Sequence, residues 1–154
     1  MKLLLVVNIH GAINSSSGVR KAMTEMKVIR KYTASVVTDD ATTVGMLKLC
    51  KGYLAWAQAD LELVSLLLKK RGMVSESRSL DPASVKALGY KDHDDMAEKM
   101  FKAGVRLSAL RGVRPFFRLA PPRGGFRTST RRQFGERGTL GPNPNLPEIV
   151  RRML

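Results

Sequence analysis

Arginine is the residue type in this chain whose number and spacing most clearly suggest a chemistry. Between residues 111 and 137 there is no lysine, and Glu136 is the only acidic residue. The same stretch contains eight arginines: Arg111, Arg114, Arg118, Arg123, Arg127, Arg131, Arg132 and Arg137. A guanidinium group carries a planar fork of N–H donors that matches phosphate oxygens, and it also stacks on flat rings. The spacing therefore predicts contacts with a polyanion, made mainly through phosphate groups.

Four phenylalanines are interleaved with these arginines: Phe116, Phe117, Phe126 and Phe134. The first two straddle a predicted strand, so we expect at least one of them in the core. Phe126 and Phe134 are instead candidates for stacking on unpaired bases, because aromatic side chains bind single-stranded nucleic acid in this way.

Chain breakers divide the arginine-rich stretch. Pro121-Pro122 acts as a hinge, and Gly124-Gly125 keeps the backbone adaptable. The hinge narrows the candidate RNA-contacting part to residues 123–137, which we call the arm. Two interpretations stay open: the arm contacts RNA, or it is a solvated and partly disordered basic tail.

The charge of the chain supports a polyanionic partner. The net charge is +14 over 154 residues, and the pI is about 10.5. Basic residues exceed acidic ones by 5 in residues 1–57, by 1 in residues 58–110 and by 8 in residues 111–154. A positive field at both ends and a nearly neutral middle indicate a functional surface, with nucleic acid favoured over an anionic membrane.

Neither a membrane segment nor a disulfide is expected. The run LLLVV near the N-terminus is far shorter than the ~20 apolar residues of a spanning helix, and a signal peptide's cleavage region is not apparent. Cys50 is the single cysteine, which fits a reducing compartment such as the cytoplasm.

Residues for catalysis or metal binding are few. His10 and His93 are the two histidines, and the aspartates around His93 are explained by the acid-rich first turn of a helix without a metal. Cys50 lies on an apolar helical stripe and is expected in the core. Gly124-Gly125 lacks the pattern of a P-loop. The sequence therefore predicts no enzyme, no metal and no cofactor.

Hydrophobic periodicity indicates the elements that would position the arm. Strands are predicted at 2–10, 31–38 and 53–57, with helices at 17–27 and from about residue 41 to Gly52. The first strand is apolar on both faces, so it should be covered on both sides. The order β-α-β-α-β predicts an α+β unit with two helices on a small sheet.

Packing details of the second helix are also predicted. Val44, Leu47 and Cys50 should line its buried side. Gly45 lowers helix propensity by about 1 kcal/mol relative to alanine, so we expect it to permit a close packing approach.

Residues 58–110 change character and become helical. Helices are predicted at 60–72, 81–89 and 92–104, with a short extended piece at 73–80. We expect this region to form an α-helical appendage docked on the first unit.

Residues 111–154 should begin with an extended segment at 116–119. Residues 138–145, rich in Gly, Pro and Asn, are predicted to be a loop. A last short helix should follow from Pro147 to Arg152, docked by four apolar residues: Leu146, Ile149, Val150 and Met153.

Three patches of sequence resemble a known family. They are SVVTDDATTVGMLKLCKGYLAW, DPASVKALGYKDHDDMAEKMFKAG, and FRLAPPRGGF together with the closing IVRRML. The chain resembles the universal L-thirty proteins of the large ribosomal subunit in their long archaeal and eukaryotic form, and the likeness covers nearly the whole chain. The Pro-Arg-Gly-Gly order in the third patch is the most specific part.

The resemblance implies a ferredoxin-like β-α-β-α-β core with a three-stranded sheet in residues 1–57, followed by the helical appendage and a basic C-terminal extension. It implies a structural role in the cytoplasmic ribosome, with large-subunit ribosomal RNA and neighbouring ribosomal proteins as partners. Candidate RNA-binding residues combine the arginine-rich stretch with a second basic edge: Arg30, Lys31, Lys48, Lys51, Arg114, Arg118, Arg123, Gly124, Gly125, Phe126, Arg127, Arg131, Arg132 and Arg137.

Two other functions are alternatives. A free RNA chaperone, or a factor for processing or assembly of ribosomal RNA, would carry the same basic surface. A small enzyme on a ferredoxin-like fold would need a pocket with a perturbed acid, base or metal, for which the sequence offers no candidate.

Overall fold

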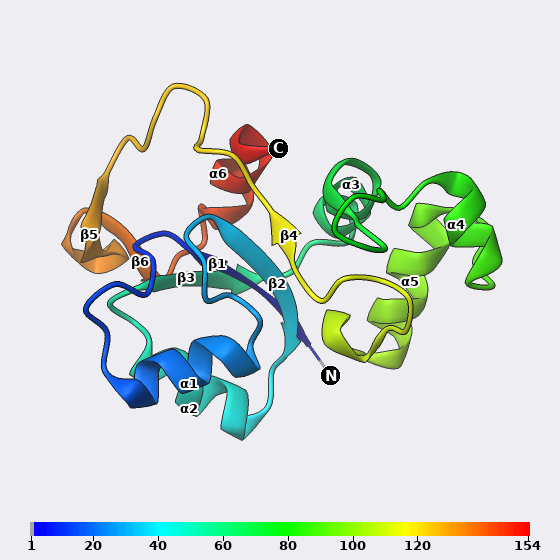
Figure 1. Cartoon of the computed structure of the whole chain (residues 1–154). Helices are drawn as coiled ribbons and strands as arrows, with labels where there is room; N and C mark the ends of the chain where they lie inside the picture. The colour runs from blue at the N-terminus through cyan, green and yellow to red at the C-terminus, as the bar shows by residue number, and fades with distance from the viewer. Residues whose placement is uncertain (1) are drawn as a thin grey trace.

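A six-stranded mixed sheet forms the centre of the computed structural model, which describes residues 2–154 (Figure 1). Its strands lie in the order β4-β2-β1-β3-β6-β5. Their bounds are β1 Leu3–Asn8, β2 Thr33–Thr38, β3 Leu54–Gln58, β4 Phe117–Arg118, β5 Ser129–Gln133 and β6 Gly138–Pro142. β2 and β3 flank β1 antiparallel, β4 pairs antiparallel with β2, and β6 runs parallel to both β3 and β5.

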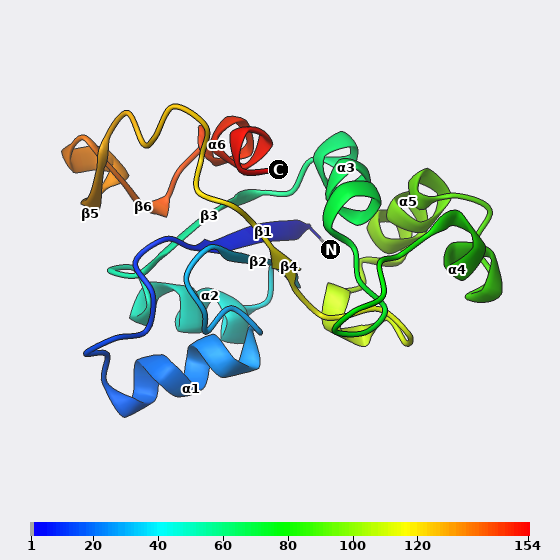
Figure 2. The same ribbon diagram turned by 45° about the horizontal axis from the view of Figure 1, so that its top comes forward.

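Six α-helices and two short 3-10 turns, η1 and η2, are found in residues 2–154. The helices are α1 Ser17–Glu25, α2 Ala41–Leu49, α3 Leu61–Arg71, α4 Pro82–Ala87, α5 His93–Ala103 and α6 Leu146–Met153; η1 is Leu107–Ala109 and η2 is Phe134–Glu136. Figures 1 and 2 both place α1 and α2 on one side of β1–β3 and α6 on the other, while β6 and β5 continue the sheet beyond β3. The β-α-β-α-β order and the α+β class are confirmed.

The three-stranded sheet was a wrong prediction, because the C-terminal region adds strands to both edges of the first three. β4 extends the sheet beyond β2, and β6 followed by β5 extends it beyond β3. The predicted loop at 138–145 was wrong for the same reason, since its first half is β6. Glycine in a strand marks close backbone approach, and here Gly138 lies against the main chain of Arg132.

The central strand is covered on both faces, as predicted. Val6 packs in a cluster with Met23 of α1 and Leu47 of α2. Leu5 points to the opposite face, into a cluster that includes Leu63 of α3. Successive strand residues point to opposite faces, so an all-apolar strand is stable only between two layers. Each fully buried Leu or Val contributes roughly 1.5–3 kcal/mol.

Local signals in the first two helices produce the observed bounds. Ser16 is the N-cap of α1, and its hydroxyl accepts a hydrogen bond from the Val19 N–H at 3.4 Å. In α2, Leu47 is buried and Val44 half-buried, close to the predicted pattern. Gly45 does not permit a close approach: it is exposed, and a Cβ added there would meet no atom within 4 Å. It lies on the solvent-exposed face of α2.

The helices predicted after residue 58 are present, and their buried side chains join the face of the sheet opposite α1 and α2. Leu67 of α3, Val85 of α4 and Met96 of α5 belong to the same cluster as Leu5. Gly104 ends α5 in the left-handed conformation with φ 60°, which suits glycine because it lacks a Cβ. In the predicted extended piece, Met73 and Ser79 form an isolated antiparallel bridge.

The C-terminal region closes this second cluster. Phe117 on β4 is fully buried while Phe116 is half-buried, which confirms that one of the pair is core. The four residues predicted to dock the last helix are all buried: Leu146, Ile149, Val150 and Met153.

Cys50 provides a test of the α1–α2 core. The thiol is buried, and burial raises its pKa from 9.0 to about 11. We expect no reaction with dithiobis(nitrobenzoate) near neutral pH until the chain unfolds. Since the folded pKa is the higher one, the unfolded chain loses this proton first as the pH rises. The free energy of unfolding should therefore fall as the pH rises from about 9 to about 11, by roughly 1.4 kcal/mol per pH unit.

Lysine and tyrosine also titrate in this range, so the measurement is the difference between the wild type and Cys50→Ala in urea denaturation. The variant should lack the extra pH dependence. Rapid labelling of the native thiol, or identical pH profiles, would contradict this picture of the core.

Candidate nucleic-acid interface

The sheet topology brings basic residues from distant parts of the chain to one end. β1 finishes at this end, where β2 and β3 begin and β4 finishes. Arg30 and Lys31 come just before β2, Lys51 just before β3, and Arg118 closes β4. All four side chains are exposed. Antiparallel pairing around one strand is therefore enough to gather residues that lie up to 88 positions apart in the sequence.

The start of the arm is held by the last helix. The Arg123 N–H donates to the Arg152 carbonyl at 3.0 Å, and Arg152 Nη1 donates to the Gly125 carbonyl at 3.0 Å. Gly124 and Gly125 adopt φ of +78° and +72°, a region that favours glycine, and they form an exposed turn. The backbone of the arm is therefore hydrogen-bonded to the rest of the fold at this point.

Phe126 packs back onto the sheet. Its ring stacks on Tyr32 with centroids 6.3 Å apart and an interplanar angle of 24°, and it is half-buried. The Lys31 ammonium lies 5.0 Å from the centre of the same Tyr32 ring. The aromatic pair thus ties the arm to the start of β2 and places Lys31 and Arg127 in one region of the surface.

The second half of the arm forms β5, which carries Arg131 and Arg132 on the edge of the sheet. Both arginines are exposed. The Gln133 side-chain amide donates to the Lys51 carbonyl at 2.8 Å, so this strand lies beside the turn that follows α2. Lys48 lies in the last turn of α2. The arginine-rich stretch and the second basic edge therefore meet, which sequence alone did not indicate.

Arg114 differs from the other candidate residues because protein groups already hold it. Its guanidinium carbon lies 4.8 Å from the centre of the Phe116 ring, and Nη2 lies 3.4 Å from Glu76 Oε1. The Arg114 side chain is 17% exposed. It forms part of a hollow next to β4 rather than of the open surface around the arm.

Most of the arginines in this region carry no partner that neutralises them. Among residues 2–154, no ion pair within 4 Å includes Arg118 or the arm's arginines: Arg123, Arg127, Arg131, Arg132 and Arg137. Their mutual repulsion is relieved only by solvent ions. A polyanion that contacts these arginines releases counterions, and this release favours binding.

Two residues at this surface were missed by sequence reasoning. Arg152 anchors the arm, but its position in an Arg-Arg pair at a helix end gave no sign of a partner 27 residues away. Gln133 joins β5 to the turn after α2, and an isolated glutamine carries no motif. Both act through contacts that only the folded chain creates.

Other kinds of site find little support in the described residues. No group of three or more His, Cys, Asp or Glu side chains within residues 2–154 is placed to hold a metal ion. The buried His93 ring has its Nε2 2.8 Å from the Leu80 carbonyl oxygen. Nearby, Asp95 accepts hydrogen bonds from the Lys91 N–H and from Lys99 Nζ, and these lower its pKa. Asp94 accepts a hydrogen bond from the Ser65 hydroxyl of α3, so these two acids bind protein groups on α5 and α3.

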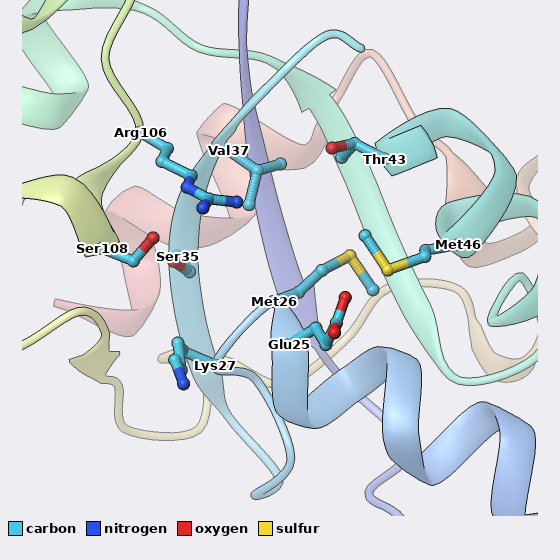
Figure 3. A pocket seen from close by; sticks show the side chains of 9 residues that line it. All are labelled: Glu25, Met26, Lys27, Ser35, Val37, Thr43, Met46, Arg106 and Ser108. Carbon is cyan, nitrogen blue, oxygen red and sulfur yellow. The ribbon is translucent and has the colours of Figure 1, made fainter. Parts of the chain in front are cut away.

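A pocket of about 350 Å³ lies between α1, α2 and β2. Arg106 and Ser108 line one side of it (Figure 3). Its ionisable side chains are one carboxylate, Glu25, and two cations, Lys27 and Arg106. The residues that line it include no histidine or cysteine to act as a base or nucleophile near neutral pH.

No helix within residues 2–154 is long and apolar enough to cross a membrane.

Comparison with known proteins finds relatives that match nearly the whole chain. No family model matches the chain. It is 36% identical over 151 residues to the large ribosomal subunit protein uL30 of Nitrosopumilus maritimus, covering 98% of this chain and 97% of the relative. Two proteins of the same name are each 33% identical to this chain. The match to the one from Thermofilum pendens covers 100% of both chains. The match to the one from Ignicoccus hospitalis covers 99% of this chain and 98% of the relative.

The close contact of β5 with β6 can be tested at two glycines. A Cβ at Gly138 would overlap the main-chain carbonyl of Arg132, so Gly138→Ala should push the two strands apart and destabilise the fold by roughly 1–3 kcal/mol. Gly135→Ala is the matched control, because a Cβ there meets no atom within 4 Å. Urea denaturation gives the stability, and hydrogen exchange reports on the amides of residues 129–133. Equal effects of the two substitutions would contradict the close approach.

Proposed function

This chain belongs to the uL30 family of large ribosomal subunit proteins, and from this premise we propose that it binds and stabilises folded large-subunit ribosomal RNA as a structural component of the ribosome. The family membership supports the ribosomal role. The RNA contacts are proposed from the surface of this chain.

The gathering of unneutralised arginines at one end of the sheet is the observation that carries the proposal. The arm's five arginines lie on the same end as Arg30, Lys31 and Lys51, without ion-pair partners within residues 2–154. Phosphate contacts supply most of the affinity in such complexes and fix the position of the protein, whereas they carry little sequence information. We therefore propose that this end clamps RNA backbones that folding of the RNA brings together.

The fixed backbone of the arm supports a clamp. Arg152 and α6 hold residues 123–125, and Gln133 holds β5 against the turn after α2. Ordering a free segment on binding costs roughly 1–2 kcal/mol per residue in backbone entropy, and a segment that is already paired avoids much of that cost. The exposed turn at Gly124-Gly125 has no side chains to keep a sugar-phosphate backbone at a distance.

The remaining candidate residues fit the same proposal in different ways. Arg118, Arg127, Arg131, Arg132 and Arg137 would contact phosphates, with Lys48 extending the surface along α2. Phe126 is already stacked on Tyr32, so we assign it an anchoring role in the arm in addition to any contact with a base. The proposed location is the cytoplasmic ribosome, with neighbouring ribosomal proteins as further partners.

Single arginine substitutions test the clamp. Arg123→Ala and Arg127→Ala should each weaken binding to fragments of large-subunit ribosomal RNA and lower the slope of log affinity against log salt by about one unit. The physical reason is the loss of one phosphate contact and of the counterions it releases. Filter binding or fluorescence anisotropy over a salt series measures both quantities.

Lys86→Ala is the matched control, because Lys86 is an exposed cation on α4, outside the basic end. It should leave the salt slope nearly unchanged. Unchanged binding after replacement of all five arm arginines by glutamine would reject the clamp. Sedimentation separates a structural component from an RNA chaperone or assembly factor: the former stays with the large subunit in high salt, and the latter is washed off.

A further inference from the structure

A second basic feature lies next to β4, the outermost strand at the other edge of the sheet, and it shares Arg30 and Arg118 with the basic end described above. A hollow of about 190 Å³ opens there, which we call the β4-edge pocket. Four cationic side chains line it, with a single acid, Glu76: the cations are Lys27, Arg30, Arg114 and Arg118. They come from the segment before β2 and from the segment around β4, so the pocket exists only in the folded chain. Such an excess of positive charge in a small concave site favours an anionic ligand.

The pocket also has an aromatic wall. Phe116 lines it, and the Arg114 guanidinium lies over the same ring at 4.8 Å. Aromatic rings and guanidinium planes are both surfaces on which nucleic-acid bases stack, so Phe116 and Arg114 each offer a flat group to a base. A site for free phosphate alone would need donors but no flat apolar wall.

The frame of the pocket is held by backbone contacts. The Arg114 N–H donates to the Met73 carbonyl at 2.8 Å, and the Ser35 hydroxyl donates to the Pro115 carbonyl at 2.9 Å. Arg118 lies opposite Thr33 in the β2–β4 register. The main-chain positions that carry Arg114, Phe116 and Arg118 are therefore fixed before any ligand arrives, which lowers the cost of binding.

Glu76 is the one group that competes with an anionic ligand, and it competes weakly. Its carboxylate is 86% exposed and lies 3.4 Å from Arg114 Nη2. This distance is longer than the 2.7–2.9 Å typical of charge-assisted hydrogen bonds, and exposed ion pairs contribute little. An incoming phosphate or base edge can take its place on Arg114.

We propose that the β4-edge pocket binds one unpaired nucleotide of an RNA, with its base against Phe116 and Arg114 and its phosphate between Arg30 and Arg118. This inference rests on the proposed function, because it takes RNA as the ligand. It goes further by giving one position a preference for a flat, unpaired base, whereas the arm holds backbones of any sequence.

The test compares two single-stranded polymers on the full chain: dodecauridylate, and a ribose-phosphate polymer of the same length that lacks bases. Phe116→Leu keeps an apolar side chain but removes the flat ring. It should weaken binding of dodecauridylate by at least about fivefold and leave binding of the base-free polymer unchanged. Equal losses for both polymers would show a phosphate site without a base and overturn the proposal.

A gain of affinity provides a second readout that does not depend on folding. Glu76→Gln should strengthen binding of dodecauridylate roughly twofold, because it removes the competing carboxylate. Glu98→Gln on α5 is its matched control, since it removes an exposed charge far from the pocket along the chain. Equal effects of these two substitutions would overturn the proposal.

Failure of the proposed function would look different. In that case Arg123→Ala would change binding of neither polymer. If only the pocket proposal fails, both polymers still bind in a salt-dependent way, and Arg123→Ala still weakens that binding.

Discussion

Strand β1 is buried on both faces and paired along both edges, and the other elements take their positions from it. Because β2 and β3 both run antiparallel to it, both begin at the end of the sheet where β1 finishes. The segments that lead into them, with Arg30, Lys31 and Lys51, therefore emerge together. Burial of one apolar strand thus determines where the positive charge of the first unit gathers.

The arginine-rich stretch joins the fold through its backbone rather than through its charges. The edges of a sheet present unpaired N–H and C=O groups, and β4 and β6 pair with them on opposite sides. In this arrangement most of the guanidinium groups remain in water while the main chain satisfies its hydrogen bonds. Phe117 and Leu140 are the buried apolar residues that attach β4 and β6 to the core, so no arginine has to be buried for this purpose.

The two basic regions differ in what their surroundings add to charge. Around the arm, the arginines lie on an exposed edge and turn, so their guanidinium groups are open to solvent. Next to β4, the protein has placed a ring and a stacked guanidinium inside a small hollow. The difference arises from depth: a recess can exclude water from one flat face of a ligand, whereas an exposed edge cannot.

The sequence by itself determined the net positive charge and the order of the elements. Charge is a sum over residues, and amphipathic patterns such as those that bury Met23, Leu47 and Val150 depend only on neighbours a few positions away. Cap and stop signals act over the same range, so helices α1 to α6 lie close to where the periodicity predicts them.

The tertiary structure alone decided which segments pair with the edges of the sheet and which distant side chains meet. The composition around Gly138 predicts a loop, yet this residue begins β6. The main chain of Arg132 lies so close to it that only a glycine fits there. Gly45 indicates close packing, yet a Cβ added there would meet no atom within 4 Å. The pairing of Arg114 with Glu76, and of Gln133 with Lys51, spans 38 and 82 positions. Such contacts depend on the space and hydrogen-bonding groups that other segments leave free, and no local pattern of residues records them.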